Sequence, residues 1–188
     1  MYNYMIHQNG YWVGLEASCQ HCYDPALGEG IANFFLKENA TRVVDFGCGM
    51  GDYVKTFRDK GINAFGCDGN PNTPQLTQNL GIVLDLSNPV QFDMKADWIM
   101  SLEVGEHLPP QFEDIFINNL HNNNVKGMVL SWAVKGQGGY GHFNEQNNDY
   151  IKEKICRLGY TNDIESENAL REISTLCYFK NTVMVFRA

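Results

Sequence analysis

A glycine-rich turn directly after a short apolar run constrains the fold of this chain more than any other feature. Residues 42–46 read Arg-Val-Val-Asp-Phe, and Gly47, Gly49 and Gly51 follow. An apolar run of that length predicts a short buried strand. The glycines allow the backbone to turn tightly and to approach a ligand closely. The segment therefore predicts a ligand-binding loop at the carboxyl end of a strand in an α/β sheet.

Apolar runs and helical patterns alternate along the rest of the chain. Strands are predicted over residues 42–46, 62–67, 81–84, 97–102, 127–134 and 182–186, with a further one from Tyr160. Helical spacing predicts helices from Leu27 to Asn39, around Val54 and Phe57, over 112–120, from an Asn144 cap to Gly159, and over 170–177, although 173–179 also fits a strand. Strands that alternate with helices predict a parallel sheet with its ligands at the carboxyl ends of the strands.

The length of 188 residues suits one domain with a sizeable core and leaves no room for a separate substrate domain. Residues 27–188 form the predicted core. Residues 1–26 precede the sheet and carry several aromatic side chains, among them Tyr11, Trp12 and Tyr23. We expect this segment to form a lid over the ligand site or to pack on the back of the sheet, and both alternatives stay open.

The formal net charge of −8 excludes some classes of partner. Sequence-independent binding of nucleic acid rests mainly on Lys and Arg that neutralise phosphates, and docking on an anionic membrane needs a basic patch. No apolar run reaches the roughly 18 residues of a membrane-spanning helix, and no secretory signal is visible at the N-terminus. The expected protein is cytoplasmic and binds neither nucleic acid nor membranes.

The six cysteines are spread along the chain, and reduced thiols are expected in that compartment. Cys19, His21 and Cys22 resemble half of a zinc site. A structural zinc site needs four ligands, and no second pair of cysteines or histidines supplies the rest. A structural metal is therefore not predicted.

Three acidic residues stand at the ends of successive predicted strands: Asp45, Asp68 and Asp85. The glycine turn reads GxGxG, with Asp52 where a nicotinamide dinucleotide fingerprint would have its third glycine. A carboxylate at Asp45 would repel a pyrophosphate but would suit an ammonium or sulfonium group. S-adenosylmethionine carries both, and this argues against a nicotinamide oxidoreductase. Asp68 can accept hydrogen bonds from ribose hydroxyls, and Asp85 can accept one from the adenine amino group.

The segment Val43–Gly51 resembles the first motif of the class I S-adenosylmethionine-dependent methyltransferases. Asp68, Asp85 and the run 101–108, Ser-Leu-Glu-Val-Gly-Glu-His-Leu, fall where that superfamily places its later motifs. The resemblance implies a three-layer α/β sandwich around a seven-stranded, mostly parallel sheet, whose last strand is antiparallel and inserted beside the fifth. It also implies S-adenosylmethionine as cofactor, bound by Asp45, Gly47, Cys48, Gly49, Asp68, Gly69, Asp85, Leu86 and Glu103.

The same resemblance places the methyl acceptor over the ends of the fourth and fifth strands. Two histidines fall on the loops there, and histidine suits the removal of a proton from an alcohol near neutral pH. His142 is the preferred general base because its glycine neighbours allow the backbone to bring it close to the acceptor, and His107 is the second choice. Glu106 can orient a histidine or bind the acceptor. These three residues could also hold a divalent metal, an alternative that is not favoured because the usual run of closely spaced acids is absent.

The loop 136–144 combines amide, ring and backbone hydrogen-bond donors, which suit a hydroxyl-rich acceptor such as a sugar, although a small phenol or heterocycle also fits. The predicted substrate-binding residues are Trp132, Gln137, Tyr140 and Asn144. The loop resembles a pattern in small sugar and glycan methyltransferases, including some of large DNA viruses of algae. The leading hypothesis is O-methylation of a small molecule or glycan, alone or within a larger multidomain or multi-enzyme glycan pathway. N-methylation, methylation of a protein side chain and a non-catalytic cofactor-binding subunit are the alternatives.

Overall fold

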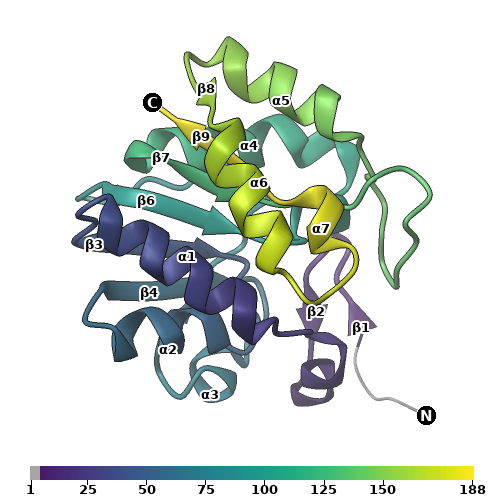
Figure 1. The fold of residues 1–188 in the computed structure, drawn as a ribbon. Coiled ribbons are helices and arrows are strands. Elements are labelled where there is room, and N and C mark those ends of the chain that lie inside the picture. The colour runs from purple at the N-terminus through teal and green to yellow at the C-terminus, as the bar shows by residue number, and fades with distance from the viewer. Residues whose placement is uncertain (1–4) are drawn as a thin grey trace.

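A seven-stranded sheet forms the centre of the computed structural model, which describes residues 5–188 and, at residues 18–20, the backbone alone (Figure 1). Its strands run in the spatial order β5-β4-β3-β6-β7-β9-β8. Their bounds are β3 (Arg42–Phe46), β4 (Asn63–Asp68), β5 (Gly81–Val83), β6 (Ala96–Ser101), β7 (Asn124–Leu130), β8 (Thr161–Asn162) and β9 (Met184–Arg187). Each neighbouring pair from β5 to β7 is parallel, and β9 is antiparallel to both β7 and β8. The predicted sheet, with its last strand inserted beside the fifth, is confirmed.

Helices cover both faces of the sheet and complete three layers (Figure 1). One face is packed by α1 (Pro25–Lys37), α2 (Asp52–Asp59) and α6 (Ile164–Ile173), together with the short α7 (Phe179–Thr182). The other face is packed by α4 (Glu113–Asn122) and α5 (Asn148–Arg157). The short α3 (Thr73–Leu76) and the 3-10 helices η2 (Gly105–His107) and η3 (Pro110–Phe112) lie in loops.

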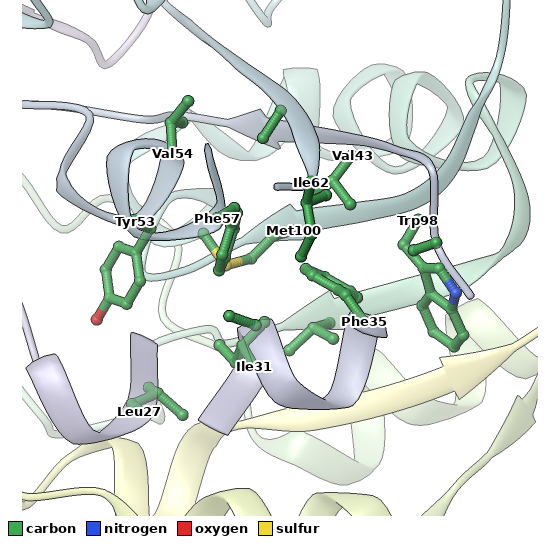
Figure 2. Close-up of a cluster of buried hydrophobic side chains, with 14 of the residues drawn as sticks. Leu27, Ile31, Phe35, Val43, Tyr53, Val54, Phe57, Ile62, Trp98 and Met100 are labelled. Atoms are coloured by element: carbon green, nitrogen blue, oxygen red, sulfur yellow. The ribbon is translucent and has the colours of Figure 1, made fainter. Parts of the chain in front are cut away.

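The apolar side chains of the strands divide between the two faces with the period of two that a pleated strand imposes. Val43 packs under α1 and α2, and its neighbour Val44 packs under α4 on the opposite face. Figure 2 shows the first cluster, in which Phe35 lies between Phe57 and Trp98. The rings of Phe35 and Phe57 meet edge to face with their centroids 5.3 Å apart. Burial on both faces explains why these strands read as continuous apolar runs.

The start of α1 shows how sequence sets an element boundary. Asp24 is the N-cap, and its Oδ1 accepts a hydrogen bond from the Leu27 backbone N–H at 3.1 Å. Pro25 occupies the first turn, where its missing N–H costs nothing. The helix ends at Lys37, and Asn39 then adopts the left-handed conformation with φ of 51°. The predicted stop at Asn39 therefore follows the last helical residue by two positions.

Three predictions differ from the structure. Residues 131–133 are buried, but residues 131–134 lie outside the strand, so β7 spans 124–130 instead of 127–134. Asn144 does not cap α5, which begins after Asn147, because the side chain of Asn144 donates to Glu113 instead. Residues 173–179 form no strand, since α6 ends at Ile173 and α7 begins at Phe179.

The N-terminal segment forms a hairpin of β1 (Met5–Ile6) and β2 (Trp12–Val13), followed by the 3-10 helix η1 (Leu15–Gln20). The hairpin lies at the carboxyl ends of the strands rather than on the back of the sheet. The Asn70 side chain, after β4, donates to Gly14 O at 3.0 Å, and the Asn9 side chain donates to Asp85 after β5. No helix within residues 5–188 is long and apolar enough to span a membrane.

Candidate active site

A pocket of about 480 Å³ opens at the carboxyl ends of β3, β4 and β6. Its volume lies in the range of cofactor and drug-sized ligand sites. Its wall includes all nine residues predicted to bind the cofactor: Asp45, Gly47, Cys48, Gly49, Asp68, Gly69, Asp85, Leu86 and Glu103. It also includes His107, Gln137, Tyr140 and His142 from the predicted acceptor side. The two groups of predicted residues therefore share one continuous cavity.

The glycine turn after β3 forms part of this wall, and its backbone conformation requires glycine at two positions. Gly47 and Gly49 have φ values of 86° and 51°, in the left-handed region. A Cβ at Gly47 would lie 2.3 Å from Cγ2 of Val104, and one at Gly49 would lie 2.5 Å from Nδ1 of His21. A side chain at either position would therefore clash with Val104 or His21 at the pocket wall.

Asp68 connects the first two strand ends. Its Oδ2 accepts a hydrogen bond from the Gly49 N–H at 3.1 Å, and its Oδ1 accepts one from the Asn70 N–H at 2.9 Å. These bonds hold the carboxylate against the glycine turn at the pocket wall. Two oxygens with a fixed orientation can still accept further hydrogen bonds from a ligand, because each carries more than one lone pair.

Asp45 places an acidic group in the floor of the same pocket. It is 3% exposed. Burial, and to a smaller extent the negative charge of Asp68, raise the pKa of Asp45 well above its ordinary value of 3.8. A cation in the pocket would relieve this penalty, whereas an anion would increase it. A positively charged ligand group beside Asp45 would therefore favour the ionised carboxylate.

Asp85 receives a partner from the N-terminal hairpin. Nδ2 of Asn9 donates to Asp85 Oδ2 at 2.8 Å. Tyr11 lies over Gly69, where a Cβ would be 2.4 Å from the Tyr11 ring. Gly10 lies so close to His107 that a Cβ would be 2.0 Å from its carbonyl oxygen. The hairpin therefore covers the pocket from the end of β4 to the segment after β6.

Glu103 joins three elements at the opposite end of the pocket. Its backbone has a φ of 53°, an unusual conformation for a residue with a side chain. Oε2 accepts a hydrogen bond from Gln137 Nε2 at 2.6 Å, and Oε1 accepts one from Thr182 Oγ1 at 3.2 Å. The carboxylate thereby links the end of β6 to the loop after β7 and to α7.

The two predicted histidines come together in the structure. Their rings meet edge to face with centroids 4.8 Å apart. Nδ1 of His107 lies 3.1 Å from Gly141 O, and Nδ1 of His142 lies 3.0 Å from Oε1 of Glu145. Both partners accept, so each ring carries a proton on Nδ1, and Nε2 is the acceptor whenever the ring is neutral. Burial, aided by the nearby His142, lowers the pKa of His107 to about 4.

Glu106 lies beneath these rings and is fully buried. Neither oxygen of its carboxyl group has a hydrogen-bond partner. Burial first, and the negative charge of Glu103 second, raise the pKa of Glu106 well above its ordinary value. Glu106 does not line the pocket itself, but one ligand atom from each of Glu106, His107 and His142 lies within 4.8 Å of the others.

Trp132 and Asn144, predicted to bind substrate, do not line the pocket. Both are buried, at 2% and 4% exposure. The Trp132 Nε1–H donates to Asn144 O at 2.7 Å, and its ring packs against Gly105, where a Cβ would lie 2.1 Å from a ring carbon. Asn144 Nδ2 donates to Glu113 at 2.7 Å. The structure uses the two side chains to join the acceptor loops to the core.

Several residues of the pocket wall were not predicted. Asn9 belongs to the N-terminal segment, for which a lid was one of two alternatives. That alternative was based on aromatic side chains, and no motif in the sequence marks Asn9 as a pocket residue. Cys177, Tyr178 and Phe179 reach the pocket from the segment between α6 and α7. Glu145, which orients His142, could have been found from its position three residues after that histidine.

Comparison with known families and structures agrees with this geometry. Residues 20–123, more than half of the chain, match the model of a family described as a methyltransferase domain. The chain belongs to that family. The predicted class I S-adenosylmethionine-dependent methyltransferase is thereby confirmed, and methyl transfer is its reaction. No curated protein matches the sequence.

Solved methyltransferases share the fold at low sequence identity. Magnesium protoporphyrin IX methyltransferase from Synechocystis PCC 6803 with bound SAH is 15% identical, with a TM-score of 0.66 over 92% of this chain and 84% of that one. A TehB-like methyltransferase from Corynebacterium glutamicum is 16% identical, with a TM-score of 0.64 over 86% of each chain. The glycopeptide N-methyltransferase MtfA is 12% identical, with a TM-score of 0.62 over 86% of this chain and 95% of that one.

Proposed function

We propose that this methyltransferase transfers the methyl group of S-adenosylmethionine to a hydroxyl of a small molecule or of a sugar or glycan. S-adenosylmethionine supplies an electrophilic methyl group on a sulfonium centre. The observation that carries the proposal is that His107 and His142, whose Nδ1 atoms are held by Gly141 and Glu145, line the same cavity as the predicted cofactor residues. A hydroxyl must lose a proton as it attacks, and these are proton acceptors.

The acidic strand ends fit the proposed cofactor. Asp68, held by Gly49 and Asn70, accepts from the ribose hydroxyls. Asp85 accepts from Asn9 and Asn88 on Oδ2 and from Ser87 on Oδ1, so the adenine amino group takes the place of one of these donors on the carboxylate. The buried Asp45 favours the cationic end of the cofactor, because a positive charge there offsets the cost of a buried carboxylate.

The acceptor lies between the loop after β6 and the loop after β7. Tyr140 is 57% exposed and offers an aromatic face at the pocket rim. Gln137 donates from Nε2 to Glu103 and accepts from the Val134 N–H on Oε1, which leaves one amide N–H and one oxygen lone pair for a ligand. An aromatic face next to an amide group suits a polar ring with several hydroxyls.

His142 accepts the proton of the acceptor hydroxyl. Its Nδ1–H is held by Glu145, so Nε2 is fixed as the free base. His107 provides a second neutral imidazole, because its pKa of about 4 keeps it uncharged at neutral pH. A base placed within hydrogen-bonding distance typically contributes 10²–10⁴ in rate.

A panel assay tests the proposal. The enzyme is incubated with methyl-labelled S-adenosylmethionine and matched pairs of acceptors that differ only in a hydroxyl or an amine at the same carbon. We expect methyl transfer to hydroxyl acceptors, with sugars and glycans above simple phenols. Transfer to the amine member of each pair and not to its hydroxyl partner would replace O-methylation with N-methylation.

A further inference from the structure

Glu106 is a buried carboxyl group that lies near the Glu103 carboxylate and has no hydrogen-bond partner for either oxygen among the residues that the structure describes. It is 0% exposed. A buried polar group without a partner is costly, and buried charges in proteins are usually paired or bound to metals. The proposed transfer of a proton to His142 makes no use of this group. The position of this buried carboxyl group next to His107 and His142 therefore indicates a second role for the three residues together.

The rings of the two histidines lie against each other, with their centroids 4.8 Å apart. His107 is fixed through Nδ1 by a backbone carbonyl, and His142 is fixed through Nδ1 by the carboxylate of Glu145. Metal-binding histidines typically donate their other N–H to a carbonyl or carboxylate in this way. In this structure a carbonyl already holds His107 and a carboxylate already holds His142 in this way.

Gly139 keeps the space beside His142 open. A Cβ at this position would lie 2.2 Å from Nε2 of His142. Any other residue would press its side chain against the nitrogen that has no partner. The loop thus combines an oriented imidazole with the smallest residue beside its free nitrogen.

We propose that Glu106, His107 and His142 bind one divalent first-row transition-metal ion at the acceptor end of the pocket. One ligand atom from each residue lies within 4.8 Å of the others, and this is the one such cluster among the described residues. Metal–nitrogen and metal–oxygen bonds are about 2.0–2.2 Å, so the three side chains must draw closer together to enclose an ion. Two imidazoles with one carboxylate favour ions such as Zn²⁺, Mn²⁺ or Co²⁺ over Ca²⁺ and Mg²⁺.

The contribution of this ion to methyl transfer rests on the proposed function. Three protein ligands leave positions open for oxygen atoms of a bound molecule. A hydroxyl held there would have a lowered pKa, since the ion stabilises the alkoxide. The imidazoles would then be ligands, and the base described above would act only in the metal-free enzyme. A polar acceptor with two neighbouring oxygens would bind most tightly.

Titration with Co²⁺ tests the site without reference to activity. We expect one Co²⁺ per chain, with visible absorption typical of nitrogen and oxygen ligands. Affinity should fall at least tenfold in Glu106→Gln, His107→Gln and His142→Gln. The matched control His121→Gln removes a histidine that contacts Tyr160 instead, and Cys22→Ser removes an exposed thiol. Both controls should bind Co²⁺ like the wild type.

Thermal denaturation guards against loss of folding. Glu106→Gln keeps the side-chain volume, so it should unfold in one transition, and Co²⁺ should raise the Tm of the wild type but not of this variant. Absence of stoichiometric Co²⁺ binding, unchanged binding in Glu106→Gln, or a thiolate charge-transfer band that disappears in Cys22→Ser would each overturn the site.

The same preparations separate this inference from the proposed function. Methylation of a hydroxyl acceptor that is unaffected by EDTA, in a protein that binds no Co²⁺, would retain the function and reject the metal. Co²⁺ binding that depends on Glu106, in a protein that methylates only amines, would retain the metal and reject the function.

Discussion

Nδ1 of His142 lies 3.0 Å from Oε1 of Glu145, and the same carboxylate accepts hydrogen bonds from the backbone N–H groups of Gly136 and Gly138. The hydrogen bond from His142 is the main reason that the pKa of Glu145 lies below its usual range. One ionised side chain thus sets both the orientation of the imidazole and the shape of the loop around it.

This relationship predicts a selective effect of Glu145→Gln. Glutamine keeps one oxygen for the loop but removes the charge that supports His142. We expect turnover to fall by about 10- to 100-fold, a loss typical for groups that orient a histidine, while the Kd for S-adenosylmethionine stays within twofold. Steady-state kinetics and calorimetry measure the two quantities. Equal losses in both would indicate a collapsed loop instead of a misoriented imidazole.

His142→Ala should lose most turnover while it still binds S-adenosylmethionine nearly normally. The base contributes about 10²–10⁴ in rate, equivalent to roughly 3–5 kcal/mol of barrier. His107→Ala provides the comparison, since its ring meets that of His142 edge to face. Near wild-type turnover in both single variants would exclude a histidine base and a histidine-bound metal together.

Asp68→Ala should weaken the binding of S-adenosylmethionine. Its carboxylate is placed to accept ribose hydroxyls, and their loss leaves polar groups unpaired at a cost of roughly 1–3 kcal/mol. That range corresponds to about 5- to 150-fold in Kd. Calorimetric titration measures it, with Asp59→Ala as a control because Asp59 pairs with Lys55 on the exposed side of α2. An unchanged Kd would remove Asp68 from the cofactor site.

Asp45→Asn should stabilise the ligand-free protein and weaken its cofactor binding. The pKa of Asp45 is raised in the folded state, so the wild type is most stable below the ordinary value of 3.8 and loses stability as pH rises towards the folded pKa. Asparagine does not ionise, so the Asp45→Asn variant does not lose stability in this pH range for that reason. We expect a gain in the free energy of unfolding at pH 7 that shrinks towards pH 4. Denaturant unfolding at several pH values checks this, and a gain that grows on acidification contradicts it.

The central strands and the wall of the pocket could be predicted because they depend on local signals, whereas the insertion of the last strand beside the fifth was predicted from the family resemblance. Apolar runs such as Val43–Phe46 must be buried on both faces, and a glycine turn must follow them for a ligand to approach. The acids at Asp45, Asp68 and Asp85 then follow from the strand ends, because the carboxyl ends of parallel strands share one edge.

Contacts between distant segments could not be predicted in this way. Trp132 and Asn144 look like ligand-binding residues in the sequence, yet they bond to each other and to Glu113 across two loops. The missing hydrogen bonds of the Glu106 carboxyl group also could not be predicted from the sequence, since they depend on how the surrounding side chains are oriented. Such properties arise only when the complete fold sets the packing.

Trp132→Phe should therefore reduce stability more than it changes substrate specificity. Phenylalanine keeps most of the ring packing on Gly105 but leaves the buried carbonyl of Asn144 without the indole N–H. An unpaired buried acceptor costs about 1–3 kcal/mol. Denaturant unfolding should show this loss, and the relative rates for different hydroxyl acceptors should be unchanged. A shift in acceptor preference without loss of stability would return Trp132 to the substrate site.

The hairpin over the pocket predicts the effect of Asn9→Ala. The variant removes the 2.8 Å hydrogen bond to Asp85, while Tyr11 still lies over Gly69. If the hairpin closes on the bound cofactor, S-adenosylmethionine should dissociate several-fold faster, because one of the contacts that hold the lid is lost. Asn88→Ala is the matched control, since Asn88 also donates to Asp85 but lies outside the pocket wall. Stopped-flow displacement measures both rates. Equal acceleration in the two variants would assign the effect to Asp85 alone, whereas acceleration in Asn9→Ala only would establish the hairpin as the lid of this methyltransferase.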